Sequence, residues 1–237
     1  MNKRFGFTLA EVLITLGIIG VVAAMTIPTL ISNTNSAKFR SQFKKTLSTV
    51  NQAALMSVAQ YEFDYAATNS SCTADSATDN ANNVMSFCSI YNGTLSGANL
   101  ETNLGGLSSQ KGNYAITKKS DVLQDLDKYY AYSLADGSLV AFPKTALGCT
   151  VPLGSTVAQK AADTTFKANC IGFIDVNGAT LPNTEVSCDT ATTAVIGTAC
   201  TVPNDAAHMT DIFPVAFHDS TVEPITNAAQ YILTTAK

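Results

Sequence analysis

The stretch that decides the fold of this chain is residues 6–31, which read GFTLAEVLITLGIIGVVAAMTIPTLI. Lys3 and Arg4 stand before it, and Glu11 is the only charged side chain between residues 7 and 37. An apolar run of this kind approaches the ~20 residues that a helix needs to cross a bilayer. The sequence therefore predicts a membrane-spanning helix that follows a short basic tip.

Three interpretations compete for this segment. The first is an ordinary secretory signal with a small-residue cleavage site at residues 22–24. The second is a plain signal anchor, which requires no particular residue at Gly6 or Glu11. The third is a signal that is cut on the cytoplasmic side, so that the apolar helix stays with the mature protein. Glu11 argues against the first, because a carboxylate inside a hydrophobic segment costs on the order of 3 kcal/mol on insertion scales.

The motif Gly6-Phe7-Thr8-Leu9-Ala10-Glu11 resembles the prepilin peptidase motif of type IV pilins and of type II secretion pseudopilins. A short basic leader ends in glycine, phenylalanine begins the processed chain, and glutamate follows four residues later. Pro28 also stands where that family usually has a helix-bending proline. The resemblance is strong over about residues 1–61 and architectural beyond them.

The resemblance implies that an aspartyl prepilin peptidase cuts between Gly6 and Phe7 and methylates the new amine of Phe7. Glycine lets an extended backbone enter a protease cleft without a side-chain clash, and Lys3 and Arg4 hold the leader in the cytoplasm. Glu11 is then explained by assembly, since its carboxylate would meet the Phe7 amine of a neighbouring subunit in a filament. The alternative is that Glu11 snorkels to the nearby membrane edge.

On this resemblance we expect a structural filament subunit rather than an enzyme. The implied partners are the prepilin peptidase, identical or related pilins and an inner-membrane assembly platform. The expected location is the bacterial inner membrane, with a single pass, and then an extracytoplasmic or cell-surface filament. Whether the chain is a major pilin, a minor pilin or a pseudopilin stays open. The rival interpretation is a membrane-anchored extracytoplasmic binding or enzymatic domain that never polymerises.

The charge and the histidines exclude other classes of function. The formal net charge is -4, with the acidic excess spread along the chain, so nucleic-acid binding is not predicted. His208 and His218 are the only histidines, and no activated nucleophile pattern accompanies them. Catalysis is therefore not predicted.

The cysteines indicate disulfides. All six follow the apolar segment and none forms a C-x-x-C pair, which in an exported chain favours disulfides over six buried thiols. Fifteen pairings of six cysteines exist. Because short loops close at lower entropic cost, we favour the pairing of sequence neighbours: Cys72 with Cys88, Cys149 with Cys170, and Cys188 with Cys200.

Residues 32–61 are expected to continue the helix beyond the membrane as an amphipathic helix. Pro28 should bend the helix or melt it locally. Apolar side chains recur at spacings of three and four, and this stripe should pack on the underside of a sheet: Phe39, Phe43, Leu47, Val50, Ala54, Val58 and Tyr61. Four cations near its start fit equally a solvated basic face and a patch near lipid headgroups: Lys38, Arg40, Lys44 and Lys45.

Residues 62–237 are expected to form a globular head of the α+β class, in a pilin-like fold with disulfide-pinned loops. The expected divisions are thus a leader at 1–6, a transmembrane or filament-core helix at 7–31, the amphipathic helix at 32–61, and this head. The head should hold an antiparallel sheet of about four strands, with a turn at Asp136-Gly137. Pro214 places the strand at 212–217 at an edge. We expect loops over residues 66–112 and a short helix over 121–130.

A calcium site is conceivable near the end of the sheet. Asp175, Asn177 and Asp211 could supply oxygen ligands, and some pseudopilins have a calcium site in that region. The alternative is an Asx turn, in which Asp175 and Asn177 bond the local backbone. The turn is favoured, because no second acidic cluster or bidentate glutamate is evident. No other cofactor is expected.

Overall fold

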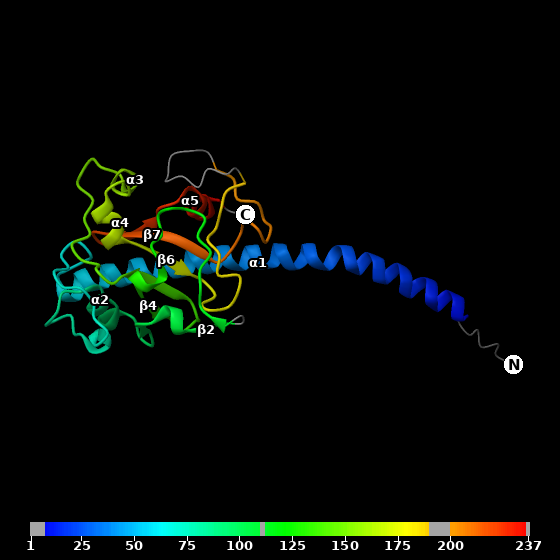
Figure 1. Ribbon diagram of the computed structural model, residues 1–237, viewed down its shortest axis with the longest axis horizontal. Coiled ribbons are helices and arrows are strands. Elements are labelled where there is room, and N and C mark those ends of the chain that lie inside the picture. Colours follow the sequence, from blue (N-terminus) through cyan, green and yellow to red (C-terminus); the bar gives the residue numbers. More distant parts are fainter. Residues whose placement is uncertain (1–7, 110–111, 190–199, 236–237) are drawn as a thin grey trace.

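The computed structural model describes residues 8–109, 112–189 and 200–235 and consists of one long helix and a head (Figure 1). Helix α1 (Leu9–Tyr61) has 53 residues, which corresponds to about 80 Å at 1.5 Å per residue. Its first half projects away from the head, and its second half lies along it (Figure 1). The expected combination of a long helix and an α+β head is confirmed.

The head contains a six-stranded antiparallel sheet in the order β1-β4-β5-β6-β7-β8, somewhat larger than the expected four strands. The strands β4 and β5 are joined by the predicted turn at Asp136, where Gly137 adopts a φ of 86°. The bounds of the six strands are Asn99–Glu101, Tyr129–Ser133, Leu139–Pro143, Ile171–Asp175, Ile212–His218 and Thr221–Pro224. A separate pair consists of β2 (Ser108–Ser109) and β3 (Gly112–Asn113).

The second half of α1 packs on this sheet through most of the predicted stripe. The side chains from Phe39 to Ala54 in that stripe are buried, and the Phe43 ring stacks on Phe213 with centroids 4.1 Å apart. The prediction fails at Val58, which is 41% exposed. Ser57 is buried in its place and donates a hydrogen bond to the carbonyl of Phe63. At 3.6 residues per turn, position 57 stays on the face of position 50 better than position 58 does.

The edge position predicted for Pro214 is wrong. Strand β7 lies between β6 and β8, and β8 is the edge strand. The ladder with β8 begins only at Val215, so Pro214 lies just outside it. Its carbonyl accepts a hydrogen bond from the backbone amide of Ile225. Proline is tolerated in this inner strand because the ladder with β8 does not extend to it.

Two local predictions in the head are also wrong. The region 66–112 is not only loop, because it contains α2 (Phe87–Thr94), which starts at a capping box formed by Ser86 and Ser89. The region 121–130 is not an α-helix. It holds a 3-10 turn, η3 (Leu126–Lys128), and then enters β4, because Tyr129 and Tyr130 pair with β5. Sheet pairing overrides the helical spacing of the apolar residues Val122, Leu123, Leu126 and Tyr130.

Short helices complete the head. They are η1 (Ser76–Thr78), η2 (Leu104–Gly106), α3 (Val157–Lys160), α4 (Thr164–Cys170) and α5 (Asn227–Thr234). The disulfides pin the loops around them and follow the pairing of sequence neighbours: Cys72–Cys88, Cys149–Cys170 and Cys188–Cys200.

Three of the four cations at the start of the head hold parts of the head. The guanidinium of Arg40 donates to the Thr235 hydroxyl at 2.6 Å, and the ammonium of Lys44 donates to the Thr235 carbonyl at 2.8 Å. Thr235 follows the end of α5, where the helix macrodipole favours cations. Lys45 forms an ion pair with Asp136 in the β4–β5 turn at 2.9 Å. Only Lys38 has no such contact within the described residues.

Candidate assembly site on the N-terminal helix

The first turn of α1 is a capping box built from Thr8 and Glu11. The Glu11 carboxylate accepts hydrogen bonds from the backbone amide and the hydroxyl of Thr8, both at 2.8 Å. The amide of Glu11 in turn donates to the Thr8 hydroxyl at 3.3 Å. A carboxylate is favourable at this end of a helix because the free amides and the macrodipole are positive there. Glu11 is therefore held at the helix start by local bonds.

One oxygen of Glu11 stays open for a partner. Both bonds from Thr8 end on Oε2, and within residues 8–109, 112–189 and 200–235 no donor reaches Oε1. The residue is exposed. A carboxylate can accept about four hydrogen bonds, so the capping box leaves room for a further donor. Gly6 and Phe7 lie outside the described residues, and the cleavage and methylation predicted for them stay predictions.

The side chains that follow form an uncovered apolar surface. Between Leu9 and Ile31 the large apolar side chains are exposed, from 44% at Val12 to 81% at Leu9. The helix is long and apolar enough to cross a membrane by length and composition. Water is an unfavourable solvent for such a surface. It therefore needs lipid or other apolar helices around it.

Threonine hydroxyls in this half are hydrogen-bonded to the backbone of the helix itself. Thr15, Thr26 and Thr29 each donate to a carbonyl of the preceding turn at 2.9 to 3.0 Å. A hydroxyl that is satisfied in this way costs little in an apolar medium. The surface between Leu9 and Ile31 therefore behaves as apolar in spite of its threonines.

Helix α1 runs through Pro28 without a break. Proline lacks the amide that would bond the carbonyl four residues earlier, so a bend is the expected response. Figure 1 shows a shallow curve in the part of α1 that projects from the head. The local melting that we considered does not occur, and a bend located at Pro28 stays a prediction.

The residues considered for calcium are brought together, but the carboxylates of Asp175 and Asp211 already accept hydrogen bonds from this chain. Asp175 accepts hydrogen bonds from the Tyr114 hydroxyl at 2.7 Å and from the Asn177 amide at 3.1 Å. The second of these contacts is the Asx turn that we weighed as the alternative. Both oxygens of Asp211 accept backbone amides at 2.9 Å, from Asn183 and Thr184.

This donor set fits calcium poorly. Among the side chains of Asp175, Asn177 and Asp211, only the Asn177 Oδ1 atom is buried without a hydrogen-bond partner in the described chain, whereas calcium takes six to eight oxygens. No group of three or more acidic, histidine or cysteine side chains suited to a metal occurs among the described residues. Burial raises the pKa of Asp175 well above its usual value, and it raises the pKa of Asp211 to about 6. Calcium binding here stays a prediction.

The two histidines lie apart and each faces carboxylates. His208 Nδ1 lies 2.8 Å from Asp205, while His218 lies 2.9 Å from both Asp219 and Glu223. No serine, threonine or cysteine nucleophile is bonded to either ring in the described residues. The geometry offers no acid-base pair with a nucleophile.

Sequence reasoning missed the role of Thr8 as the N-cap residue that bonds Glu11. The pattern Thr8-x-x-Glu11 immediately before an apolar run is the sequence signature of a capping box. The pattern is readable from the chain, but our two explanations of Glu11, a partner in a filament and snorkelling to the membrane edge, did not use it. The structure gives Glu11 a role within its own subunit and leaves an oxygen for a second one.

Comparison with known proteins gives a family match for this segment only. Residues 1–27 match the family model described as the prokaryotic N-terminal methylation motif. No curated protein and no solved structure matches the chain. The chain thus carries a prepilin-type motif on a long apolar helix, as type IV pilin-like proteins do. Motif and helix together support a single-pass protein anchored in the membrane.

Proposed function

We propose that this protein is a structural subunit of an extracytoplasmic filament of the type IV pilus or type II secretion pseudopilus kind. In this proposal a prepilin peptidase cleaves between Gly6 and Phe7 and methylates the Phe7 amine. The mature chain then remains in the inner membrane until an assembly platform transfers it to the filament. The family match at residues 1–27 and the uncovered apolar half of α1 support this order of events.

The state of Glu11 is the observation that carries the proposal. A carboxylate at the edge of an apolar helix is costly unless it finds positive partners. Thr8 satisfies Oε2, and Oε1 is left exposed in the described residues. The amine of Phe7 on an adjacent subunit would be a suitable donor. Such a pair would fix the stagger of adjacent helices, because it is the only charge match available between residues 7 and 37.

Packing must supply the rest of the assembly energy. A helix that leaves lipid for a bundle exchanges one apolar medium for another, so the hydrophobic effect alone does not drive the step. Close contact between helices and the satisfaction of the buried charge then decide the outcome. A variant can therefore insert normally in the membrane and still fail to assemble.

Two substitutions separate charge from capping. Glu11→Gln keeps an oxygen that can complete the capping box but removes the charge, whereas Thr8→Ala removes the cap and keeps the charge. We expect Glu11→Gln and Glu11→Ala to be processed and membrane-bound, with filament yield in sheared surface fractions at least about tenfold lower. Thr8→Ala should lose less, since an exposed N-cap contributes about 1 kcal/mol.

Intact mass of the mature protein provides the second measurement. A species that begins at methylated Phe7 is expected for the wild type and for all three variants. A species that begins at Met25 would instead indicate ordinary secretion, and a chain that retains residues 1–6 would contradict processing. Suppose that Glu11→Gln gives a normal filament yield and Thr8→Ala does not assemble. Glu11 would then act only as part of the helix cap, and its charge would have no role in assembly.

A further inference from the structure

The charges of the first 110 residues are segregated by sign. No acidic residue occurs from Val12 to Tyr61, and no basic residue occurs from Thr46 to Gln110. We call the four cations in the first interval the basic start: Lys38, Arg40, Lys44 and Lys45. We call the first four acids of the second interval the acidic end: Glu62, Asp64, Asp75 and Asp79.

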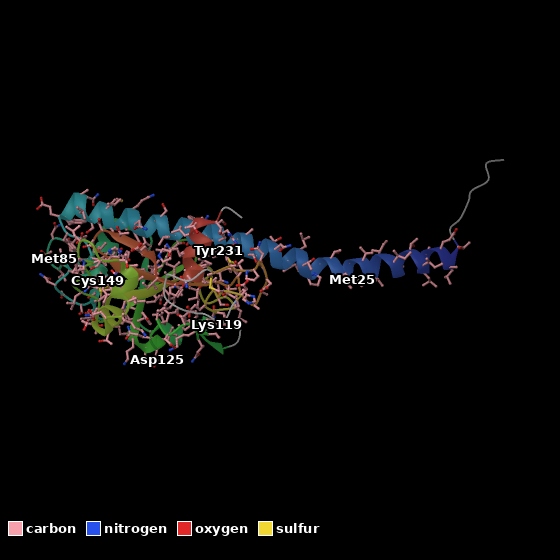
Figure 2. All side chains as sticks on the ribbon, turned by 90° about the horizontal axis from the view of Figure 1, so that it is seen from above. Met25, Met85, Lys119, Asp125, Cys149 and Tyr231 are labelled. Atoms are coloured by element: carbon pink, nitrogen blue, oxygen red, sulfur yellow. A yellow bond between two sulfur atoms is a disulfide. The ribbon has the colours of Figure 1, made fainter. Side chains whose placement is uncertain are left out.

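The fold places these two groups at opposite ends of the head. Helix α1 runs along the head, with the basic start where it enters and Glu62 directly after its last residue. Glu62 follows Lys38 by 24 positions, which corresponds to about 36 Å of helix. Asp79 belongs to the same end, because it lines a surface hollow together with Tyr61. Figure 2 shows Met85 at this far end and Met25 on the projecting part of α1.

The acidic end has no cationic partner within the described chain. The lysine ion pairs of the described residues involve Asp125, Asp127, Asp136 and Asp163, and none involves the acidic end. Glu62 and Asp75 are exposed, and so is Lys38 at the other end. The acidic end is therefore not neutralised by its own subunit. In the basic start, Lys45 pairs with Asp136, and Arg40 and Lys44 bond Thr235, so Lys38 is the cation left for another copy among the described residues.

We propose that the acidic end of one copy contacts the basic start of the next copy, head to tail along the filament. Two different surfaces that match each other form a heterologous contact, and such contacts repeat into open filaments rather than closed dimers. Opposite charges at the two ends favour this order and oppose head-to-head contact. The inference rests on the proposed function, since it describes how filament subunits are ordered.

Lys38 and Glu62 are the best test positions, because both are exposed and no described hydrogen bond uses either side chain. Charge attraction between subunits predicts that Lys38→Glu and Glu62→Lys each lower filament yield by about tenfold. The double variant, with the charges exchanged, should recover to within about twofold of the wild type. Lys38→Glu combined with Asp121→Lys is the matched control and should not recover, because Asp121 is exposed but outside the acidic end.

Photo-crosslinking in the full-length protein gives an independent reading. A photoreactive residue at position 38 should crosslink to residues 62–79 of another copy in sheared filaments, as identified by mass spectrometry. Thermal unfolding of the purified variants should match the wild type, which confirms that the heads are folded.

The outcomes separate this contact from the proposed function. Normal yields for both single variants, absence of rescue in the double variant, or crosslinks only to other regions would overturn the contact and leave filament assembly intact. Crosslinks from position 38 only to lipid would do the same and would assign the basic start to headgroups. A processed wild-type chain that never enters a filament would overturn the proposed function and this contact with it.

Discussion

The side chain of Asn51 on α1 makes two hydrogen bonds to the backbone of Val222. Its Nδ2 donates to the Val222 carbonyl, and its Oδ1 accepts from the Val222 amide, at 2.9 and 2.7 Å. Val222 lies in β8, the edge strand of the sheet. One amide side chain thus occupies backbone groups that a free edge would present to another strand. The long helix is attached to the sheet by polar contacts as well as by its apolar stripe.

Replacement of Asn51 by alanine should therefore weaken the head. The change leaves the Val222 amide and carbonyl without partners, and an unsatisfied buried polar group costs about 1 to 3 kcal/mol. We expect the free energy of unfolding to fall by about 2 kcal/mol in Asn51→Ala, measured by denaturant titration of the mature protein in detergent. Gln52→Ala is the control, since Gln52 is exposed and its side chain bonds only Ser48 within the part of the chain that the structure describes. Equal stability of the two variants would show that water replaces the hydrogen bonds of Asn51 to Val222 without a loss in the free energy of unfolding.

The N-terminal half of the molecule could be predicted from its sequence because its signals are local. The apolar run, the single carboxylate and the apolar spacing of three and four define one continuous helix without reference to the rest of the chain. The stripe failed only at Val58, where a small drift in helical phase decides which residue is buried. The contact of Asn51 with Val222 was not predictable, because 171 residues separate the two partners.

The head was harder to predict because its elements depend on distant contacts. The apolar residues Val122, Leu123, Leu126 and Tyr130 have a spacing that suits a helix, but pairing with β5 places Tyr130 in strand β4. The polar composition of residues 66–112 hid α2, a helix that buries the ring of Phe87. At the candidate calcium residues, the sequence could show that oxygen atoms cluster but not that Tyr114 and backbone amides already bind them.

Gly172 in β6 should tolerate no side chain. A methyl group built on it would overlap the backbone carbonyl oxygen of Ala141 in β5 and would lie 2.9 Å from the ring of Phe217. Because backbone atoms of a central strand cannot move aside, Gly172→Ala should lower the free energy of unfolding by about 3 kcal/mol. Gly105→Ala is the matched control, with the nearest atom 4.0 Å away, and it should change stability by less than about 1 kcal/mol. A stable Gly172→Ala head would show that β5 and β6 can separate without loss.

Chelation tests the calcium prediction directly. The oxygens of Asp175 and Asp211 accept hydrogen bonds from this chain, so we expect no change in the thermal midpoint of the purified protein when EGTA is added. Added calcium should likewise leave the midpoint unchanged, since a ligand stabilises only the state that binds it. A midpoint that falls with EGTA and recovers with calcium would mean that metal displaces the Asx turn.

His218 is arranged to carry a positive charge. Its Nδ1 lies 2.9 Å from an Asp219 oxygen and its Nε2 lies 2.9 Å from a Glu223 oxygen. A neutral imidazole donates through one nitrogen only, so just the imidazolium satisfies both contacts. Burial lowers the pKa of His218, but hydrogen bonds to Glu223 and Asp219 and the charges of both carboxylates outweigh it and raise the pKa above its usual value.

The raised pKa of His218 predicts a loss of stability in mild alkali. Protons bind the folded head more tightly than the unfolded chain, so the contribution is complete below the unfolded pKa of about 6.5 and disappears as the pH rises through the folded value. The thermal midpoint should therefore fall between pH 6 and pH 9 more in the wild type than in His218→Gln. Titration of Asp175 and Asp211 affects both proteins, so the difference isolates His218. Equal slopes in the wild type and in His218→Gln would mean that His218 is neutral in the folded head.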